Sequence, residues 1–480
     1  MGIDEGMLHL VIDEAQRAGA EYAEARYHRR VDWEILSRQG KIIAVGKSIS
    51  EGVGVRVIVN GVLAFSATND LTREGILRAL NNALSEAKAH SKHMINPIEF
   101  AETRVGRVRY DVKPIKRFDE VPVEEKISLV KEAWNRACKG VKEAKVASLL
   151  IGYGEFIEEK LIVNSDGAYI YSVIPRLRLE YNIVLHHPQK GTIQRFNMLG
   201  ASGGIEWLKK WRMPDLLTDE TRSVEHVLIK GVEPPKEKVD IVLGPEVVGL
   251  IVHESCGHPS EADRILGREA AQAGKSFIKP DMIGTKIGNE YATVIDDPTI
   301  PGSYGFYLYD DEGVPARARY LYREGLINEF LHNRWTAKIL GVESNASARA
   351  MDYNSEPIIR MANTYLKPGD YTFEELLEDI KLGVYIKNYM EWNIDDTRWS
   401  QRYVGLESYI IRNGELCEPV RNPILEITTK SFYSNIDAVD RNLEFVAGTC
   451  GKGEPAQGMP VWFGGPNVKL KNIPLRVMSI

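Results

Sequence analysis

The stretch that organises this chain is VDIVLGPEVVGLIVHESCGHPSEAD, residues 239–263. Its first five residues, Val239–Leu243, are rich in β-branched side chains and predict a short strand. Gly244 and Pro245 then predict the start of a helix, because proline at the first helical position sacrifices no hydrogen bond. The following residues are apolar on nearly every side, which predicts a buried helix. This helix leads directly into a cluster of histidines and carboxylates.

The cluster contains His253 and His258, two of the ten histidines of the chain, with Glu254 beside the first. In many metallopeptidases two histidines at positions i and i+4 of a helix bind zinc, and the glutamate between them acts as a general base. Here the spacing is i+5, which separates the two side chains by about 140° on a regular helix. Pro259 cannot donate to the carbonyl of Ser255, so we predict a bulge or a helix end that brings the two histidines together.

A metal site of this kind is not established by two histidines alone, since neighbouring histidines on a buried helix can equally be core or capping residues. A catalytic zinc needs three protein ligands and one open position. Candidates for the third ligand are Glu261 and Asp263, which are close in sequence, and Cys450, whose flanking glycines predict a tight turn. Cys256 points away from His253 on a helix, and we interpret it as a packing residue.

The rest of the sequence predicts an α+β protein, because strands and helices are segregated rather than regularly alternating. Asn60-Gly61 predicts a hairpin turn, and Asp70 or Thr72 predicts a helix cap. The helices expected in the N-terminal part span residues 8–18, 72–92, 123–144 and 220–229. The strands expected there are 22–27, several short runs broken by glycines within 42–65, then 146–153, 158–164, 168–173 and 177–186.

A charged, proline-rich stretch at residues 233–238 predicts a domain boundary. We expect residues 1–230 to form an N-terminal domain in which helices flank a layer of antiparallel strands. We expect residues 239–480 to form a β-rich C-terminal domain that carries the histidine helix, with two further helices near 334–340 and 372–380.

Composition excludes several classes of protein. The 480 residues are 44% apolar and 27% charged, as in ordinary globular proteins, and 61 basic against 67 acidic residues give a net charge of −6. This balance provides no electrostatic basis for binding nucleic acid or an anionic membrane. The chain also lacks an uninterrupted apolar run of about 18 residues, its start does not resemble a signal peptide, and its four cysteines are scattered. We therefore expect a cytoplasmic protein without nucleic-acid or membrane partners.

The motif His-Glu-x-x-x-His at residues 253–258, followed by Pro-Ser-Glu-Ala-Asp, resembles the TldD/PmbA family of cytosolic metallopeptidases, also called the modulator of DNA gyrase family. The resemblance extends over nearly the whole chain. Other segments similar to the family are Gly52–Val59, Ala64–Leu71, Asp310–Gly313, Pro357–Gly369 and Gly448–Lys452. Because only the TldD branch of the family keeps the histidine motif, the chain resembles its catalytic member.

The resemblance implies the roles of four residues. His253, His258 and Cys450 would bind Zn²⁺, and Glu254 would activate water. It further implies a zinc-dependent peptidase that hydrolyses unfolded or short peptides, as a homodimer or as a heterodimer with a PmbA-type paralogue. The alternative is a non-catalytic peptide-binding or scaffold subunit of a heteromeric protease.

Substrate contacts are expected on three segments. Arg360 and Asn363 are candidates to hold the substrate backbone or the oxyanion. Peptide main chain would add to a sheet edge near residues 304–309 or 359–365. The stretch Asn388–Asn393 stands where the family often has a glycine-rich run, which bears on substrate preference.

Overall fold

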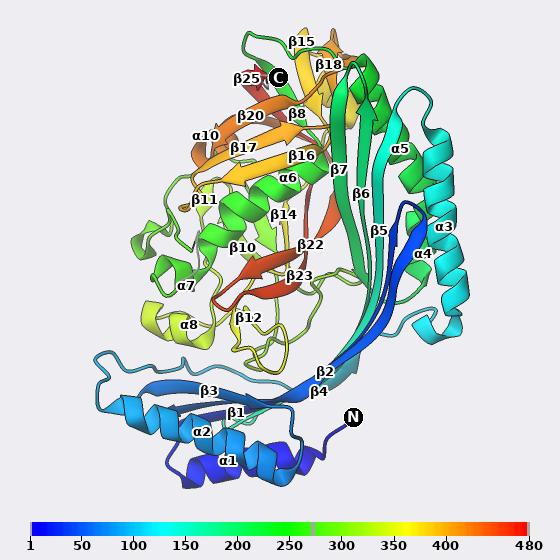
Figure 1. Cartoon of the computed structure of the whole chain (residues 1–480). Coiled ribbons are helices and arrows are strands. Elements are labelled where there is room, and N and C mark those ends of the chain that lie inside the picture. The colour runs from blue at the N-terminus through cyan, green and yellow to red at the C-terminus, as the bar shows by residue number, and fades with distance from the viewer. Residues whose placement is uncertain (1, 270–273, 478–480) are drawn as a thin grey trace.

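The computed structural model describes residues 2–269 and 274–477, and it has the predicted α+β class (Figure 1). The N-terminal half is built on one large sheet with the strand order β3-β2-β1-β5-β6-β4, and β7 also pairs with β6. Neighbouring strands are antiparallel except for β4 and β6. The strands are β1 Tyr22–Arg38, β2 Lys41–Val59, β3 Val62–Thr68, β4 Arg107–Asp111, β5 Lys145–Asn164, β6 Tyr169–His187 and β7 Gly191–Ser202.

Helices cover this sheet at its two ends (Figure 1). Helices α1 and α2 bury an apolar core that includes Val55 of β2, whereas α3 and α5 bury a second core that includes Ile151 of β5. Thr72 caps α2 by accepting a hydrogen bond from the N–H of Gly75 at 3.1 Å. The helices of this half are α1 Glu5–Arg17, α2 Arg73–Ser91, α3 Val123–Gly140, α4 Glu206–Trp211 and α5 Met213–Lys230.

The long strands differ from the short ones that the sequence predicts. Segments 146–153 and 158–164 are one strand, β5, and segments 168–173 and 177–186 are one strand, β6. The polar residues between them are buried and paired rather than placed in turns: Glu155 pairs with Lys126 at 2.6 Å. In the same way, β2 continues without interruption through the glycines at 46, 52 and 54, where short separate strands were expected. The hairpin predicted at Asn60-Gly61 is confirmed.

The C-terminal half contains the sheets β11-β10-β9-β14-β23-β22, β19-β18-β15-β8-β24-β21 and β16-β17-β20-β25, and the pair β12-β13. They enclose one large apolar core. The first strands are β8 Val239–Leu243, β9 Val294–Asp296, β10 Arg319–Arg323, β11 Leu326–Ile327, β12 Ala348–Arg349, β13 Ile358–Ile359, β14 Asn363–Leu366, β15 Leu382–Ile386 and β16 Tyr389–Ile394. The others are β17 Ser400–Gly405, β18 Ser408–Arg412, β19 Glu415–Pro419, β20 Pro423–Thr428, β21 Ile436–Val439, β22 Glu444–Lys452, β23 Gln457–Gly465, β24 Val468–Ile473 and β25 Leu475–Val477.

Short helices connect these strands. The helix predicted at 334–340 is confirmed as α8, whereas the one predicted at 372–380 is limited to α9. The helices are α6 Pro245–Val252, α7 Ala262–Ile265, α8 Arg334–Leu340, α9 Phe373–Leu377 and α10 Thr429–Ser434, with a π-helical turn at His253–Gly257 and 3₁₀ turns at Phe118–Glu120, His258–Ser260 and Pro280–Met282.

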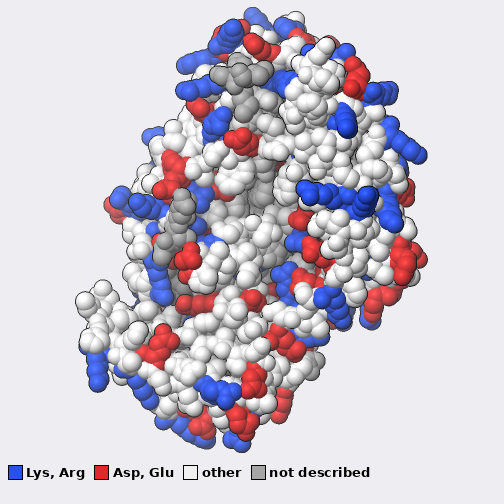
Figure 2. Space-filling view, viewed as in Figure 1, with Lys and Arg blue, Asp and Glu red and all other residues white. Residues whose placement is uncertain are grey.

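Buried charges join the two halves of the chain. Arg56 of β2 donates to Glu24 at 2.7 Å and to Glu312 of the C-terminal half at 2.9 Å. Lys160 of β5 binds Asp311 at 3.1 Å. On the surface, acidic and basic side chains are interspersed over the face shown in Figure 2. Within residues 2–269 and 274–477, no helix combines the length and the apolar character needed to cross a membrane.

Candidate metal centre

Helix α6 holds the histidine motif in the core, as its apolar sequence predicts. It begins at Pro245 and packs on β23. The contact is close at Gly249, where a Cβ atom would lie 2.6 Å from the backbone nitrogen of Gly464, so only glycine permits this approach. The acidic side chain of the helix, Glu246, is paired with Arg195 of β7 at 2.6 Å. The helix is therefore fixed against both halves of the chain.

The distortion predicted from Pro259 is confirmed. The chain from His253 forms a π-helical turn, in which the N–H of His258 donates to the carbonyl of His253, five residues back. The carbonyl of Ser255, which Pro259 cannot serve, accepts a hydrogen bond from the hydroxyl of Tyr322 at 3.1 Å. The ring centroids of the two histidines lie 4.9 Å apart. The wider turn thus brings together side chains that a regular helix would separate.

Cys450 lies beside the histidines, but the tight turn predicted around it is wrong. Its flanking glycines lie on strand β22, and the turn follows at residues 453–456. The sulfur is 3.5 Å from Nε2 of His258, and one ligand atom from each of Cys450, His258 and His253 lies within 4.8 Å of the others. Tetrahedral zinc with usual bond lengths separates a sulfur and a nitrogen ligand by roughly 3.5 Å.

The protonation states of these three groups suit a metal ion. Burial lowers the pKa of both His253 and His258, which favours the neutral imidazoles that metals require. Burial alone would raise the pKa of the Cys450 thiol, but His258 and Arg360 lower it to about 7. Nδ1 of His253 is buried and has no hydrogen-bond partner among the described residues. Two imidazoles, of which that of His253 has an unsatisfied ring nitrogen, and one cysteine sulfur are a ligand set that fits Zn²⁺.

The two carboxylates considered as alternative third ligands have other partners. Oε2 of Glu261 lies 3.1 Å from Nδ1 of His258 and accepts from Arg264 at 2.5 Å. Asp263 accepts from Lys452 at 2.7 Å. Burial would raise the pKa of Glu261, yet Lys452 and Arg264 hold it well below its usual range. A charged Glu261 can only accept, so Nδ1 of His258 carries the proton and Nε2 is left to face Cys450.

Glu254 lines a pocket together with the three candidate ligands. The pocket has a volume of about 390 Å³. Glu254 is almost fully buried, and its carboxylate is paired with the guanidinium of Arg398. Apolar side chains from several elements complete the wall: Phe196, Met198, Leu250, Tyr389, Trp392, Val446, Ala447, Val461 and Phe463. Cys256 is buried in the apolar core, in agreement with its interpretation as a packing residue.

The predicted substrate-contacting residues do not face this pocket. Arg360 is fully buried and donates to the carbonyls of Gln457, at 2.8 Å, and of Cys450. Asn363 is also fully buried and accepts from the N–H of Gly305 at 3.2 Å. Both side chains thus hold the loops and strands around the site, and we do not include them in a substrate site.

The predicted sheet edges are wrong as well. Residues 304–309 form no strand, because their backbone is taken up by turns and one isolated bridge. Residues 363–366 are β14, which lies between β9 and β23 in the interior of its sheet. The terminal strand nearest the candidate metal centre is β22, which carries Cys450 itself.

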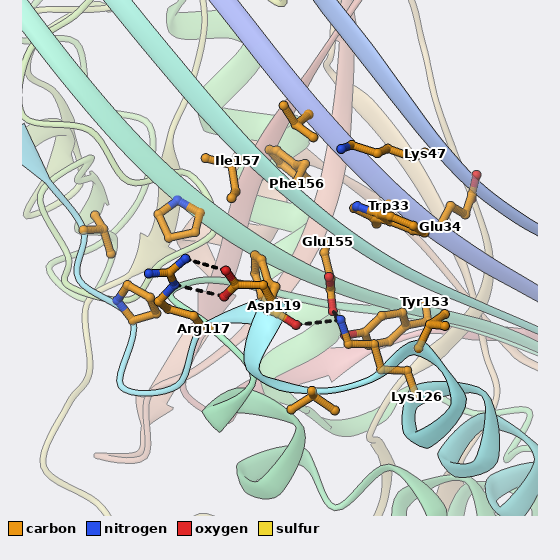
Figure 3. A pocket seen from close by; sticks show the side chains of 18 of the residues that line it. Trp33, Glu34, Lys47, Arg117, Asp119, Lys126, Tyr153, Glu155, Phe156 and Ile157 are labelled. Atoms are coloured by element: carbon orange, nitrogen blue, oxygen red, sulfur yellow. Dashed lines mark hydrogen bonds and ion pairs between the residues drawn. The ribbon is translucent and has the colours of Figure 1, made fainter. Parts of the chain in front are cut away.

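A larger cavity, of about 640 Å³, shares no lining residue with the pocket at the histidines. It lies against strands β1, β2, β5 and β6 and is bounded by the start of α3, which contributes Val123 and Lys126. Two pairs of its charged groups interact: Lys126 with Glu155, and Arg117 with Asp119 at 2.9 Å (Figure 3). Most of its other lining residues are apolar.

Two residues of the site were not singled out from sequence. Arg398 has no local signal, because it reaches Glu254 across 144 positions. Lys452 lies two residues after Cys450, and its pairing partner Asp263 is 189 positions away. Both residues are recognisable by their burial, but burial depends on the complete fold and cannot be inferred from the sequence.

Comparison with known proteins identifies the family. The family description PmbA/TldA metallopeptidase matches in three parts: domain 1 over residues 23–87, the central domain over 116–222 and the C-terminal domain over 236–476. The chain belongs to the PmbA/TldD metallopeptidase family, as its motifs predict.

Relatives with this architecture span the full length of the chain. It is 30% identical to a metalloprotease of Methanocaldococcus jannaschii, over 96% of this chain and 99% of that protein. It is 28% identical to a zinc metalloprotease TldD homolog of Saccharolobus solfataricus, over 96% and 98%. The crystal structure of TldE from Thermococcus kodakarensis has the same fold, with a TM-score of 0.75 at 18% identity, covering 98% of this chain and 100% of that chain.

Proposed function

We propose that this protein is a zinc-dependent peptidase that hydrolyses unfolded or short peptides in the cytosol. The observation that carries the proposal is the convergence of His253, His258 and Cys450 within 4.8 Å, beside Glu254 in one pocket. Its similarity to metalloproteases supports the same reaction class.

Each residue has a distinct task in this proposal. Zinc, when bound by His253, His258 and Cys450, would supply Lewis acidity toward the scissile carbonyl and would acidify water. Glu254 takes a proton from the attacking water and returns it to the leaving amine. Glu261 holds the ring of His258 in one orientation and one tautomer.

The pocket and its surrounding strands suggest how a peptide binds. Strand β22 ends its sheet, so an extended peptide can pair with its main chain, which gives affinity with little dependence on sequence. The exposed faces of Phe196 and Trp392 then offer apolar contact to one side chain of the peptide. A pocket of about 390 Å³ admits side chains but not a folded domain. We also propose that the protein acts as a dimer, either with a second copy of itself or with a PmbA-type paralogue.

The decisive experiment measures zinc content and cleavage of a fluorogenic unstructured peptide in parallel. We expect about one zinc per chain in the wild type, and its loss in both His253→Ala and Cys450→Ala. Glu254→Gln should keep zinc and bind the peptide but lose cleavage. Cys138→Ala, which changes a half-buried cysteine on α3, is the control and should retain both properties. Zinc-free wild type contradicts the proposal and favours the binding-subunit alternative, whereas cleavage by Glu254→Gln contradicts the role given to Glu254.

A further inference from the structure

Arg398 has an unusual backbone for a residue so close to a candidate active site. It lies in the turn between β16 and β17 with φ +68°, in the left-handed region that residues other than glycine and asparagine seldom occupy. The neighbouring chain fixes it there. Its N–H donates to the carbonyl of Asp395 at 3.0 Å, and its own carbonyl accepts from the hydroxyl of Thr429 at 2.8 Å.

The side chain of Arg398 points from this turn into the pocket. The residue is 8% exposed, and its guanidinium pairs with the carboxylate of Glu254. Tyr389 and Tyr403 also lie close enough to Glu254 to interact with its charge, and Arg398 is the cation that pairs with this carboxylate among the described residues. Backbone strain that persists beside reactive groups is a recurrent sign of function.

We propose that Arg398 is a positioning residue that fixes the carboxylate of Glu254 toward the pocket. This inference rests on the proposed peptidase function. A charge-assisted hydrogen bond from Nη1 of Arg398 fixes the position of Oε2 of Glu254, and the planar guanidinium sets a direction for this bond that the point charge of a lysine does not. The strained turn brings the guanidinium of Arg398 to the carboxylate of the proposed base.

The test uses the full-length zinc-loaded protein and five variants. Arg398→Gly removes the side chain and suits the positive φ, so it preserves the turn. Arg398→Lys keeps a charge without the planar geometry. Glu324→Gly, at φ +49° in an exposed turn, is the control for glycine at a positive φ. Comparing Glu254→Gln with the double variant Glu254→Gln/Arg398→Gly tests whether the arginine acts through the glutamate.

We expect Arg398→Gly to keep one zinc and a KM within about threefold of wild type, while kcat falls about 100-fold, as expected for a misplaced catalytic group. Guanidinium chloride at non-denaturing concentration should restore at least a tenth of the rate lost in Arg398→Gly. The kcat of Arg398→Lys should lie between those of the wild type and of Arg398→Gly. Added to Glu254→Gln, Arg398→Gly should not lower the residual cleavage rate of that variant any further. Glu324→Gly should behave as wild type.

Several outcomes would overturn the inference. Wild-type kcat in Arg398→Gly, a loss without guanidinium rescue, or an additive loss in the Glu254→Gln background each show that Arg398 does not act through the glutamate. Loss of zinc together with unfolding in both Arg398→Gly and Arg398→Lys assigns it a structural role. If the wild type holds zinc and cleaves peptide, the proposed function stands in all these cases. If the wild type is inactive, both the proposed function and the role of Arg398 are wrong.

Discussion

Replacing Glu261 with glutamine tests how the candidate metal centre is tuned. The carboxylate is fully buried, and its Oε2 lies 3.1 Å from Nδ1 of His258. Glutamine has nearly the same shape but lacks the charge that orients the imidazole and increases its basicity. Loss of such a second partner typically weakens metal binding 10- to 100-fold, which corresponds to about 1.4–2.7 kcal/mol. We therefore expect Glu261→Gln to bind zinc 10- to 100-fold more weakly than wild type, at unchanged stoichiometry.

The assay must separate this effect from the cost of disturbing a buried ion cluster. Lys452 faces both Glu261, at 3.4 Å, and Asp263, at 2.7 Å. Neutralising either carboxylate leaves the lysine with less negative charge around it, so Glu261→Gln and Asp263→Asn should both destabilise the zinc-free protein, by about 3 kcal/mol. Only Glu261 contacts a histidine, so Asp263→Asn is the matched control for zinc affinity.

Zinc affinity would be measured by competition with a chromophoric chelator at neutral pH, and stability by chemical unfolding of the zinc-free proteins. The expected pattern is a common loss of stability but a loss of affinity confined to Glu261→Gln. Equal zinc affinity in Glu261→Gln and wild type would refute the orienting role of Glu261. Equal weakening in both variants would show that the ion cluster as a whole, rather than the contact with His258, governs the metal.

Two further predictions concern stability and substrate binding. Burial lowers the pKa of His332 to about 4 from an ordinary value near 6.5, so the folded chain binds fewer protons than the unfolded chain between these values. The resulting stabilisation is fully present above pH 6.5 and is lost as the pH falls toward 4, by about 3 kcal/mol. His332→Gln should flatten that part of the curve of unfolding free energy against pH, and an unchanged slope contradicts the assignment. Trp392→Ala should raise KM for a peptide with a bulky apolar side chain about fivefold to thirtyfold. Trp33→Ala, which alters a tryptophan of the same 39% exposure in the other cavity, should leave KM unchanged, and equal effects would argue against a side-chain contact at Trp392.

Local patterns in the sequence predicted local structure well. The Asn60-Gly61 turn, the Thr72 cap and the start of α6 at Pro245 each depend on residues a few positions apart. The lengths of β5 and β6 were underestimated because Gly154 in β5 and Pro175 in β6 are residue types that usually interrupt strands. Glu155 is compatible with a continuous strand only because Lys126 lies beside it in the fold.

The same distinction holds for the candidate metal centre. The i+5 spacing and Pro259 were sufficient to predict a bulge, since the missing hydrogen bond is a local property. The strand conformation of Cys450 was missed because glycines on a strand and glycines in a turn have the same sequence signature. Arg360 was assigned to substrate because sequence does not reveal that Nη1 and Nη2 of its guanidinium donate to backbone carbonyls.

The contacts that complete the site all join distant parts of the chain. His258 and Cys450 are 192 positions apart, Glu254 and Arg398 are 144 apart, and the ion pair of Lys452 with Asp263 spans 189. In an unfolded chain, loops of this length leave no preformed set of three ligands. Zinc would therefore bind the folded state preferentially and stabilise it in proportion to RT ln(1 + [Zn]/Kd). The proposed active site therefore forms only in the folded chain. The folded enzyme then differs from the unstructured peptides proposed as its substrates, because its own chain is folded rather than offered in extended form for cleavage.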